Sequence, residues 1–263
     1  EKLKNDPSVD KIDGGLMNAS IVFEIKLKSG LRVVVREDKS LPAVHVGLAL
    51  LGGQRWEPEA LPGAANLLSE MLDHGAKSKS KLALADAIES LGASLSTFGG
   101  RNTYGINLRC LKEDLPQVFA LGAECLLEPV FPEDELAKVK EEVIAAIEQE
   151  DEDLWTMNGK VLRPLLYGKH PYGQPVNGTK ESVAKIAASD LAKLHAQWAR
   201  PENLAIAFVG DVTVVQALEL VNKYFGAFKA QGEFQAPKQA IEPLAGEKKG
   251  ERSKAGIEGV TLA

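Results

Sequence analysis

Four polar side chains that could take part in metal or acid–base chemistry interrupt a leucine-rich stretch, "NLLSEMLDHG", at residues 66–75. They are Asn66, Ser69, Glu70 and Asp73, and their spacings of three, four and seven residues place them on one stripe of an α-helix. The leucines and the methionine of the stretch then form the opposite, buried face. Such a stripe is most often the solvated side of an amphipathic helix, so a functional role needs support from the rest of the chain.

A second arrangement with ligand-like residues lies one turn further along. Glu70, Asp73 and His74 form a Glu-x-x-Asp-His pattern in which Glu70 and His74 stand at i and i+4, as two metal ligands on a helix would. Gly75 follows at once, which places His74 at the helix end. A lone histidine there more often interacts with the helix dipole or lies on the surface, so we expect no catalytic metal at this pair.

The other histidines and both cysteines are predicted to be structural. His45 alternates with apolar residues in a predicted strand, His170 lies in a loop, and His195 lies on a predicted helix. Cys110 and Cys125 have neither CxxC spacing nor a companion histidine cluster, which indicates two buried free thiols.

Composition and charge exclude several classes of partner. The 263 residues carry 31 basic and 37 acidic side chains, a net charge of -6, so the chain has no overall positive field to attract nucleic acid or an anionic membrane. No run of eighteen apolar residues exists, so we expect no membrane insertion. We expect a soluble protein of the bacterial cytoplasm or periplasm, with the choice between them left open.

The elements that position the polar stripe follow from residue periodicity and from Gly and Pro. The first half predicts a hairpin about Ser29-Gly30, a strand at 43–51, a helix from about Leu61 to His74 capped by Gly75, a helix at 80–92, and a hairpin of strands 93–98 and 103–111. The second half predicts helices at 112–128, 132–168 and 189–198, a strand at 203–210 and a helix at 214–226. This order predicts an α+β fold, with a mixed or antiparallel sheet covered on one face by helices.

The same patterns predict the domain organisation. We expect an N-terminal lead-in over residues 1–19, one α+β domain over 20–230, and a linker over 231–256, which is rich in Lys, Gln, Gly and Pro. Residues 257–263 resemble the start of a strand, which indicates the beginning of a second, similar domain.

Five blocks of the chain resemble the insulinase and pitrilysin type of zinc peptidases, in particular the bacterial branch related to mitochondrial processing peptidase. The blocks are "GGQRWEPEALPGAANLLSEMLDHGA", "LGASLSTFGGRNTYGINLRCLKEDL", "EPVFPEDEL", "KHPYGQPVNGTKESV" and "ARPENLAIAFVGDV". The resemblance covers residues 20 to about 230 and rests on the joint order and spacing of the blocks.

The resemblance implies where a zinc site would lie, and this chain departs from it. Active members carry His-x-x-Glu-His before a Met-Leu-x-x-Gly sequence, with a distal Glu as third ligand. Anchoring on residues 71–75 puts the ligand positions at Asn66 and Glu70, the general-base position at Ser69, and the distal ligand at Ala146, or at Glu148 after a slip of two. Because Asn is a poor zinc ligand and Ser has no carboxylate to accept a proton, we expect no cofactor, whereas active relatives bind zinc.

The resemblance also implies a function and partners. Two-chain members of the family pair a zinc-bearing subunit with a zinc-free one that shapes a chamber around unfolded peptides. We expect this chain to be that noncatalytic subunit or half of it, with a zinc-bearing paralogous peptidase or a second copy of itself as partner. In active members the substrate pairs with a sheet edge, which would here include Ser96, Thr97, Phe98, Gly99 and Gly100, and we expect the two glycines to leave that edge sterically open.

Two alternatives remain open from the sequence. One is a purely structural role, like that of the core proteins of the mitochondrial respiratory complex, which share the fold. The other is an active zinc endopeptidase with an atypical site at Glu70 and His74.

Overall fold

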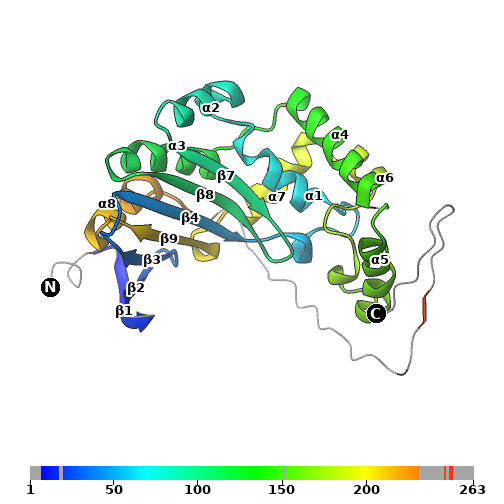
Figure 1. Cartoon of the computed structure of the whole chain (residues 1–263), viewed down its shortest axis with the longest axis horizontal. Helices are drawn as coiled ribbons and strands as arrows, with labels where there is room; N and C mark the ends of the chain where they lie inside the picture. The colour runs from blue at the N-terminus through cyan, green and yellow to red at the C-terminus, as the bar shows by residue number, and fades with distance from the viewer. Residues whose placement is uncertain (1–6, 18–19, 151, 231–245, 247–248, 251–263) are drawn as a thin grey trace.

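A seven-stranded sheet with helices gathered on one face organises the chain (Figure 1). The computed structural model describes residues 7–17, 20–150, 152–230, 246 and 249–250. Within them the strand order is β1-β2-β3-β9-β4-β8-β7, and every neighbouring pair is antiparallel except β3 and β9. The strands are β1 (Val9–Met17), β2 (Ser20–Leu27), β3 (Arg32–Glu37), β4 (Ala43–Leu51), β7 (Ser94–Gly99), β8 (Thr103–Leu111) and β9 (Leu204–Gly210). This mixed sheet confirms the predicted fold class.

Helices, two short strands and 3-10 turns make up the remaining elements. The helices are α1 (Ala64–Glu70), α2 (Lys81–Glu89), α3 (Leu115–Leu127), α4 (Glu133–Glu150), α5 (Leu154–Tyr167), α6 (Lys180–Lys185), α7 (Ala188–Trp198) and α8 (Val214–Phe225). The short elements are the strands β5 (Gly75–Ala76) and β6 (Lys79–Ser80) and the 3-10 turns η1 (Gln54–Trp56), η2 (Met71–Asp73), η3 (Lys112–Asp114), η4 (Pro171–Gly173) and η5 (Pro201–Asn203). No helix in the described part of the chain is both long and apolar enough to cross a membrane.

Alternation along the strands decides which face of the sheet the helices cover. On β4, Val44, Val46, Leu48 and Leu50 are buried, while the residues between them are partly exposed. Because successive side chains of a strand point to opposite faces, the even-numbered residues of β4 face the helices. The other face, which we call the open face, carries the odd-numbered residues of β4 and the side chains in register with them.

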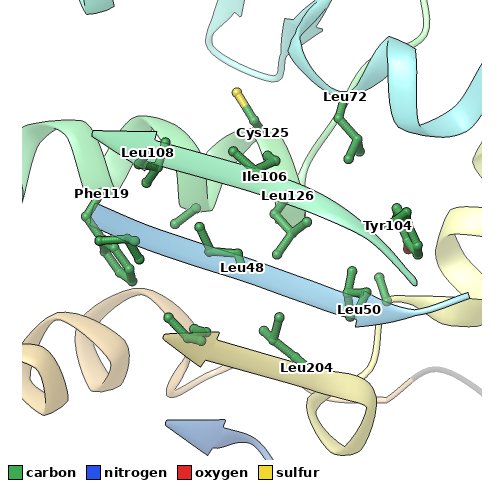
Figure 2. Close-up of a cluster of buried hydrophobic side chains, with 14 of the residues drawn as sticks. Leu48, Leu50, Leu72, Tyr104, Ile106, Leu108, Phe119, Cys125, Leu126 and Leu204 are labelled. Carbon is green, nitrogen blue, oxygen red and sulfur yellow. The ribbon is translucent and has the colours of Figure 1, made fainter. Parts of the chain in front are cut away.

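The core lies between the strands in the middle of the sheet and helix α3 (Figure 2). Phe119 of α3 is fully buried and stacks on Phe208 of β9, with ring centroids 5.4 Å apart. Burying an aromatic ring of this size stabilises a fold by roughly 1.5–3 kcal/mol. Figure 2 also shows other core side chains. The strands contribute Leu48, Leu50, Tyr104, Ile106, Leu108 and Leu204, the turn η2 contributes Leu72, and helix α3 contributes Cys125 and Leu126.

The sheet extends into residues that the sequence pattern places before the domain. We expect a lead-in over residues 1–19, whereas Val9–Met17 forms β1, with Val9 opposite Leu27 and Met17 opposite Ser20. Val9 and Ile12 pack against the core, and this contact stabilises the strand. The polar and glycine residues of β1 obscure the alternation of apolar and polar side chains that would have predicted a strand. Apart from residues 246, 249 and 250, the predicted linker and the predicted start of a second domain lie outside the described residues.

Two helical predictions are too long. The helix predicted from Leu61 begins at Ala64, because Gly63 adopts a left-handed conformation at φ 92° and ends the preceding turn. The same helix ends at Glu70 and continues as η2, so Gly75 is no helix cap and belongs to β5. The long helix predicted at 132–168 divides into α4 and α5, where the carboxylate of Asp153 accepts a hydrogen bond from the Thr156 amide and begins a new helix.

Candidate functional site

Helix α1, which carries the polar stripe, is anchored at its N-terminus by a carboxylate from outside the helix. Glu57 accepts hydrogen bonds from the amides of Gly63 (3.2 Å) and Ala65 (2.6 Å). Because Gly63 supplies no side-chain cap, Glu57 satisfies first-turn amides that would otherwise have no partner. Burial raises the pKa of Glu57 to about 7, against the lowering effect of the two hydrogen bonds.

Ser69, at the general-base position of the resemblance, is buried between α1 and β7. Its side chain is 1% exposed, and its hydroxyl donates to the carbonyl of Asn66 over 2.7 Å. A Cβ on Gly99 of β7 would lie 2.0 Å from the Ser69 hydroxyl oxygen, so the glycine leaves the space that Ser69 fills. The stripe is therefore not a uniformly solvated face, and on the helix side of β7 the space beside Gly99 is occupied by Ser69.

The other positions of the stripe are more accessible. Asn66 is half-buried and Glu70 is exposed. Partial burial raises the pKa of Glu70, and the negative charges of Asp73 and of Glu142 on α4 act in the same direction, with His74 opposing them. Of the α4 residues, Glu142 thus influences the pKa of Glu70, whereas the predicted position Ala146 carries no charge.

The distal ligand positions on α4 do not complete a metal site with α1. Ala146 is exposed and offers no donor atom. Glu148, the position reached by a slip of two, accepts from Lys180 of α6 over 2.7 Å. Among the residues that the structure describes, no group of three or more His, Cys, Asp and Glu side chains is arranged to hold a metal ion.

The alternative pair of Glu70 and His74 also lacks a free imidazole nitrogen. The Nδ1 atom of His74 lies 3.0 Å from a carboxylate oxygen of Asp73, and its Nε2 atom lies 2.7 Å from the Lys81 ammonium. Lys81 donates to Nε2, so the ring is in the tautomer that donates from Nδ1 to Asp73. Metal binding at Nε2 would first have to displace Lys81, which also pairs with Glu135 over 3.2 Å.

The predicted peptide-binding segment lies on β7, at one end of the strand order, with its side chains divided between two faces. The register with β8 places Ser96 and Phe98 on the open face and Thr97 and Gly99 toward the helices. A peptide on one face of the sheet would therefore contact only some of the predicted side chains. The rest of its binding would come from hydrogen bonds to the main chain of β7.

A hydrogen-bonded cluster fixes the turn after β7, and the sequence analysis did not identify it. Gln54 is buried and donates to the carbonyl of Gln174, while Arg101 donates to the Gln54 side-chain oxygen; both distances are 2.5 Å. The Tyr172 hydroxyl donates to the side chain of Asn102 over 2.6 Å. The local sequence signal was limited to Arg101 and Asn102 in the turn after two glycines. Their partners, Gln54 and Tyr172, are distant in the sequence, so a local pattern could not identify the cluster.

The remaining histidines and the cysteines contact protein groups. Burial lowers the pKa of His195 to about 4, and the Tyr104 hydroxyl lies 3.3 Å from its Nδ1 atom. His170 accepts from the Tyr172 amide over 3.2 Å. Both cysteines are buried and unbonded, and burial raises the pKa of Cys110 to about 11 and of Cys125 to about 12, so neither is a reactive thiolate.

Two family patterns match the chain. The pattern for insulinase, peptidase family M16, matches residues 32–180, and the pattern for the peptidase M16 inactive domain matches residues 185–261. Together they include both the polar stripe and the helix-rich second half.

Three curated relatives differ in how their names describe peptidase activity. An uncharacterized zinc protease of Mycobacterium leprae is 28% identical over 82% of this chain and 48% of its own length. A protein of Helicobacter pylori named a non-peptidase homolog is 27% identical over 79% and 48%, and subunit 1 of the bovine mitochondrial cytochrome b-c1 complex is 26% identical over 76% and 42%. The chain spans about half the length of the curated relatives it matches.

A solved structure has the same fold. The peptidase M16 inactive domain from Pseudomonas fluorescens superposes with a TM-score of 0.79, at 28% identity, over 84% of this chain and 54% of its own.

Proposed function

The chain belongs to the insulinase family, peptidase family M16, and we propose that it is a noncatalytic subunit, or half of such a subunit, in a two-chain zinc peptidase. Its role is to form part of the wall of the chamber that encloses unfolded peptides. Its partner is a zinc-bearing paralogous peptidase subunit, with self-association as the other possible assembly.

The environment of Ser69 carries this proposal. A hydrolytic zinc site needs a carboxylate at this position to accept a proton from the metal-bound water. Here the position holds a hydroxyl that donates to the Asn66 carbonyl and packs against β7. A larger acidic side chain would need the space beside Gly99, so more than one substitution separates this site from a catalytic one.

The similarity to a protein named a non-peptidase homolog and to the inactive-domain structure supports the noncatalytic role. The name of the Mycobacterium leprae relative points the other way. The α1 ligand positions, Asn66 and Glu70, and the α4 position Ala146 support the noncatalytic role, because they supply one carboxylate and no imidazole.

The first experiment measures metal content and peptide cleavage. The purified full-length protein is assayed with an unfolded fluorogenic peptide, alone and after mixing with a paralogue that carries an intact His-x-x-Glu-His motif. We expect substoichiometric zinc and no cleavage by the protein alone, and cleavage that appears or rises in the mixture. About one zinc per chain together with cleavage by the protein alone would instead establish an atypical active site.

A matched pair of variants assigns the catalysis within the mixture. Glu70→Ala should change the cleavage rate of the mixture by less than about twofold, because Glu70 takes part in no catalytic step. Replacing the motif glutamate of the paralogue with Gln should abolish cleavage. A large loss with a folded Glu70→Ala protein would contradict the noncatalytic assignment.

A purely structural role is the second candidate, and the similarity to subunit 1 of the cytochrome b-c1 complex favours it. The same mixture distinguishes it. A stable complex with the paralogue that leaves the cleavage rate unchanged would support a structural subunit.

A further inference from the structure

A polar hollow of about 330 Å³ lies on the open face of the sheet, away from the helices and from the stripe on α1. It is lined by His45 of β4, by Asn107 and Arg109 of β8, and by Ser94 and Ser96 of β7. Nothing in the proposed function accounts for a cation and four polar side chains gathered at this corner of the sheet.

Strand register explains why these residues converge. Ser94 lies opposite Arg109, and Arg109 lies opposite His45, so the three form one row across β7, β8 and β4. Ser96 and Asn107 form the next row on the same face, two residues along each strand. The hollow is thus built into the rigid sheet and does not depend on a loop.

The lining groups are suited to an anion. The Arg109 Nε atom donates to His45 Nδ1 over 3.0 Å, which orients the guanidinium and leaves its two terminal nitrogens available. In the described part of the chain no acidic group forms an ion pair with Arg109, and the side chains of Ser94, Ser96 and Asn107 make no hydrogen bond. The lining contains no Asp or Glu. A guanidinium fork flanked by hydroxyl and amide donors matches the planar, bidentate geometry of a carboxylate.

The position beside the sheet edge indicates where the carboxylate comes from. No further strand pairs with the outer edge of β7 within the described residues. A peptide strand added there would lie about 4.8 Å from β7 and therefore about 10 Å from the backbone of β8. The side chains of Arg109 and of a peptide Glu together span that distance, and a peptide residue facing Ser94 or Ser96 would direct its side chain to the open face.

We propose that this hollow binds the side-chain carboxylate of an acidic residue in a peptide that pairs with the edge of β7. The inference rests on the proposed function, in that it assumes peptide enclosure, and it adds a preference among peptides. The net charge of -6 would repel acidic peptides on average, so such a preference requires a local cationic site.

Binding of matched peptides to the full-length protein tests the preference. Three fluorescent unfolded peptides differ only in carrying Glu, Gln or Lys at alternate positions, and their affinities are measured by fluorescence anisotropy at low and moderate salt. We expect the Glu peptide to bind about tenfold more tightly than the Gln peptide, a difference of roughly 1.4 kcal/mol, and to lose part of this advantage in salt.

Three variants locate the effect. Arg109→Gln should remove the preference for the Glu peptide, and Arg109→Glu should reverse it in favour of the Lys peptide. Arg32→Gln is the control, because Arg32 is an exposed cation on the same face and lies three strands away from β8. It should change the Glu-to-Gln ratio by less than about twofold. Thermal unfolding of each variant verifies that the fold is retained.

The outcomes separate this inference from the proposed function. Equal binding of all three peptides, unchanged in Arg109→Gln, would overturn the carboxylate site while leaving peptide enclosure in place. If Arg32→Gln removes the preference for the Glu peptide as fully as Arg109→Gln does, the preference arises from the total charge of the open face, and the carboxylate site at Arg109 is overturned. Absence of binding by any peptide would overturn both.

Discussion

Ser69 and Gly99 are in close contact at the position that corresponds to the general base of active relatives. Ser69 fills the space beside Gly99. The contact joins two regular elements, helix α1 and strand β7, which pack against each other. A side chain larger than Ser at position 69, or larger than Gly at position 99, requires one element to move. The loss of a carboxylate at position 69 and the close approach of helix and strand therefore reinforce each other.

Gly99→Ala tests this contact. The added methyl group would lie 2.0 Å from the Ser69 oxygen and 2.6 Å from its Cβ atom, so we expect a loss of about 1–3 kcal/mol in the free energy of unfolding. Urea denaturation measures the change. Gly100→Ala is the control, since its added methyl group would lie 3.8 Å from the Thr103 carbonyl oxygen, and its stability should equal or slightly exceed that of the wild type. Equal stability of both variants would show that Ser69 does not pack on β7.

At the scale of elements, helix α7 buries an imidazole together with its apolar face. His195 is 6% exposed, lies near the Tyr104 hydroxyl of β8, and also lines an apolar groove of about 850 Å³ between α3, α7 and α8. The neutral ring suits this environment, and burial lowers its pKa to about 4. The packing of α7 therefore depends on a group that acid can protonate.

Acid should weaken this packing through His195. The unfolded chain takes up the proton near the ordinary pKa of 6.5, whereas the folded protein resists it until about pH 4. The stability contribution is therefore complete above pH 6.5 and is lost as the pH falls toward 4, by about 3 kcal/mol in total. Urea denaturation across this range should show a shallower decline for His195→Asn than for the wild type.

The control for this pH dependence is His45→Asn, which replaces a half-buried histidine on the open face. It should keep the wild-type decline between pH 6.5 and 4. If His195→Asn and the wild type lose stability in parallel, the buried imidazole does not govern the acid response and carboxylates elsewhere must do so.

At the scale of the whole molecule, the sheet has one helix-covered face, one open face and two edge strands, β1 and β7. The open face adjoins the edge at β7, where the proposed carboxylate site and the proposed peptide-pairing edge meet. A chamber wall needs this arrangement, because the face that lines a cavity has to remain accessible after the core is complete.

Two truncations test the boundaries of this domain. Removal of residues 231–263 should shift the melting temperature by only about 2 °C, since within the part of the chain that the structure describes every strand of the sheet and every residue of the core cluster lies before residue 231. Removal of residues 1–17 deletes β1, whose Val9 and Ile12 pack against the core, and should lower the melting temperature by more than about 5 °C. The opposite ranking, measured by thermal unfolding, would contradict the assignment of β1 to the domain.

Periodicity in the sequence was sufficient to predict the order of most strands and helices, because alternation such as that of β4 and amphipathic spacing such as that of α1 are local properties. The same spacing placed Asn66, Ser69 and Glu70 on one stripe of α1, and anchoring it on Met71 connected that stripe with a zinc motif. It did not reveal β1, where glycine and charged residues obscure the alternation.

Only the tertiary structure decided what each side chain of the stripe contacts. The contact of Ser69 with Gly99, the engagement of His74 by Lys81, and the row of Ser94, Arg109 and His45 all depend on strand pairing or helix packing between distant segments. Such contacts are set by register and by the close packing of the core, and a local pattern carries no information about either. The residue types thus predicted that the zinc ligands and the general base of active relatives are missing from the corresponding positions, and the fold showed which protein groups those positions contact.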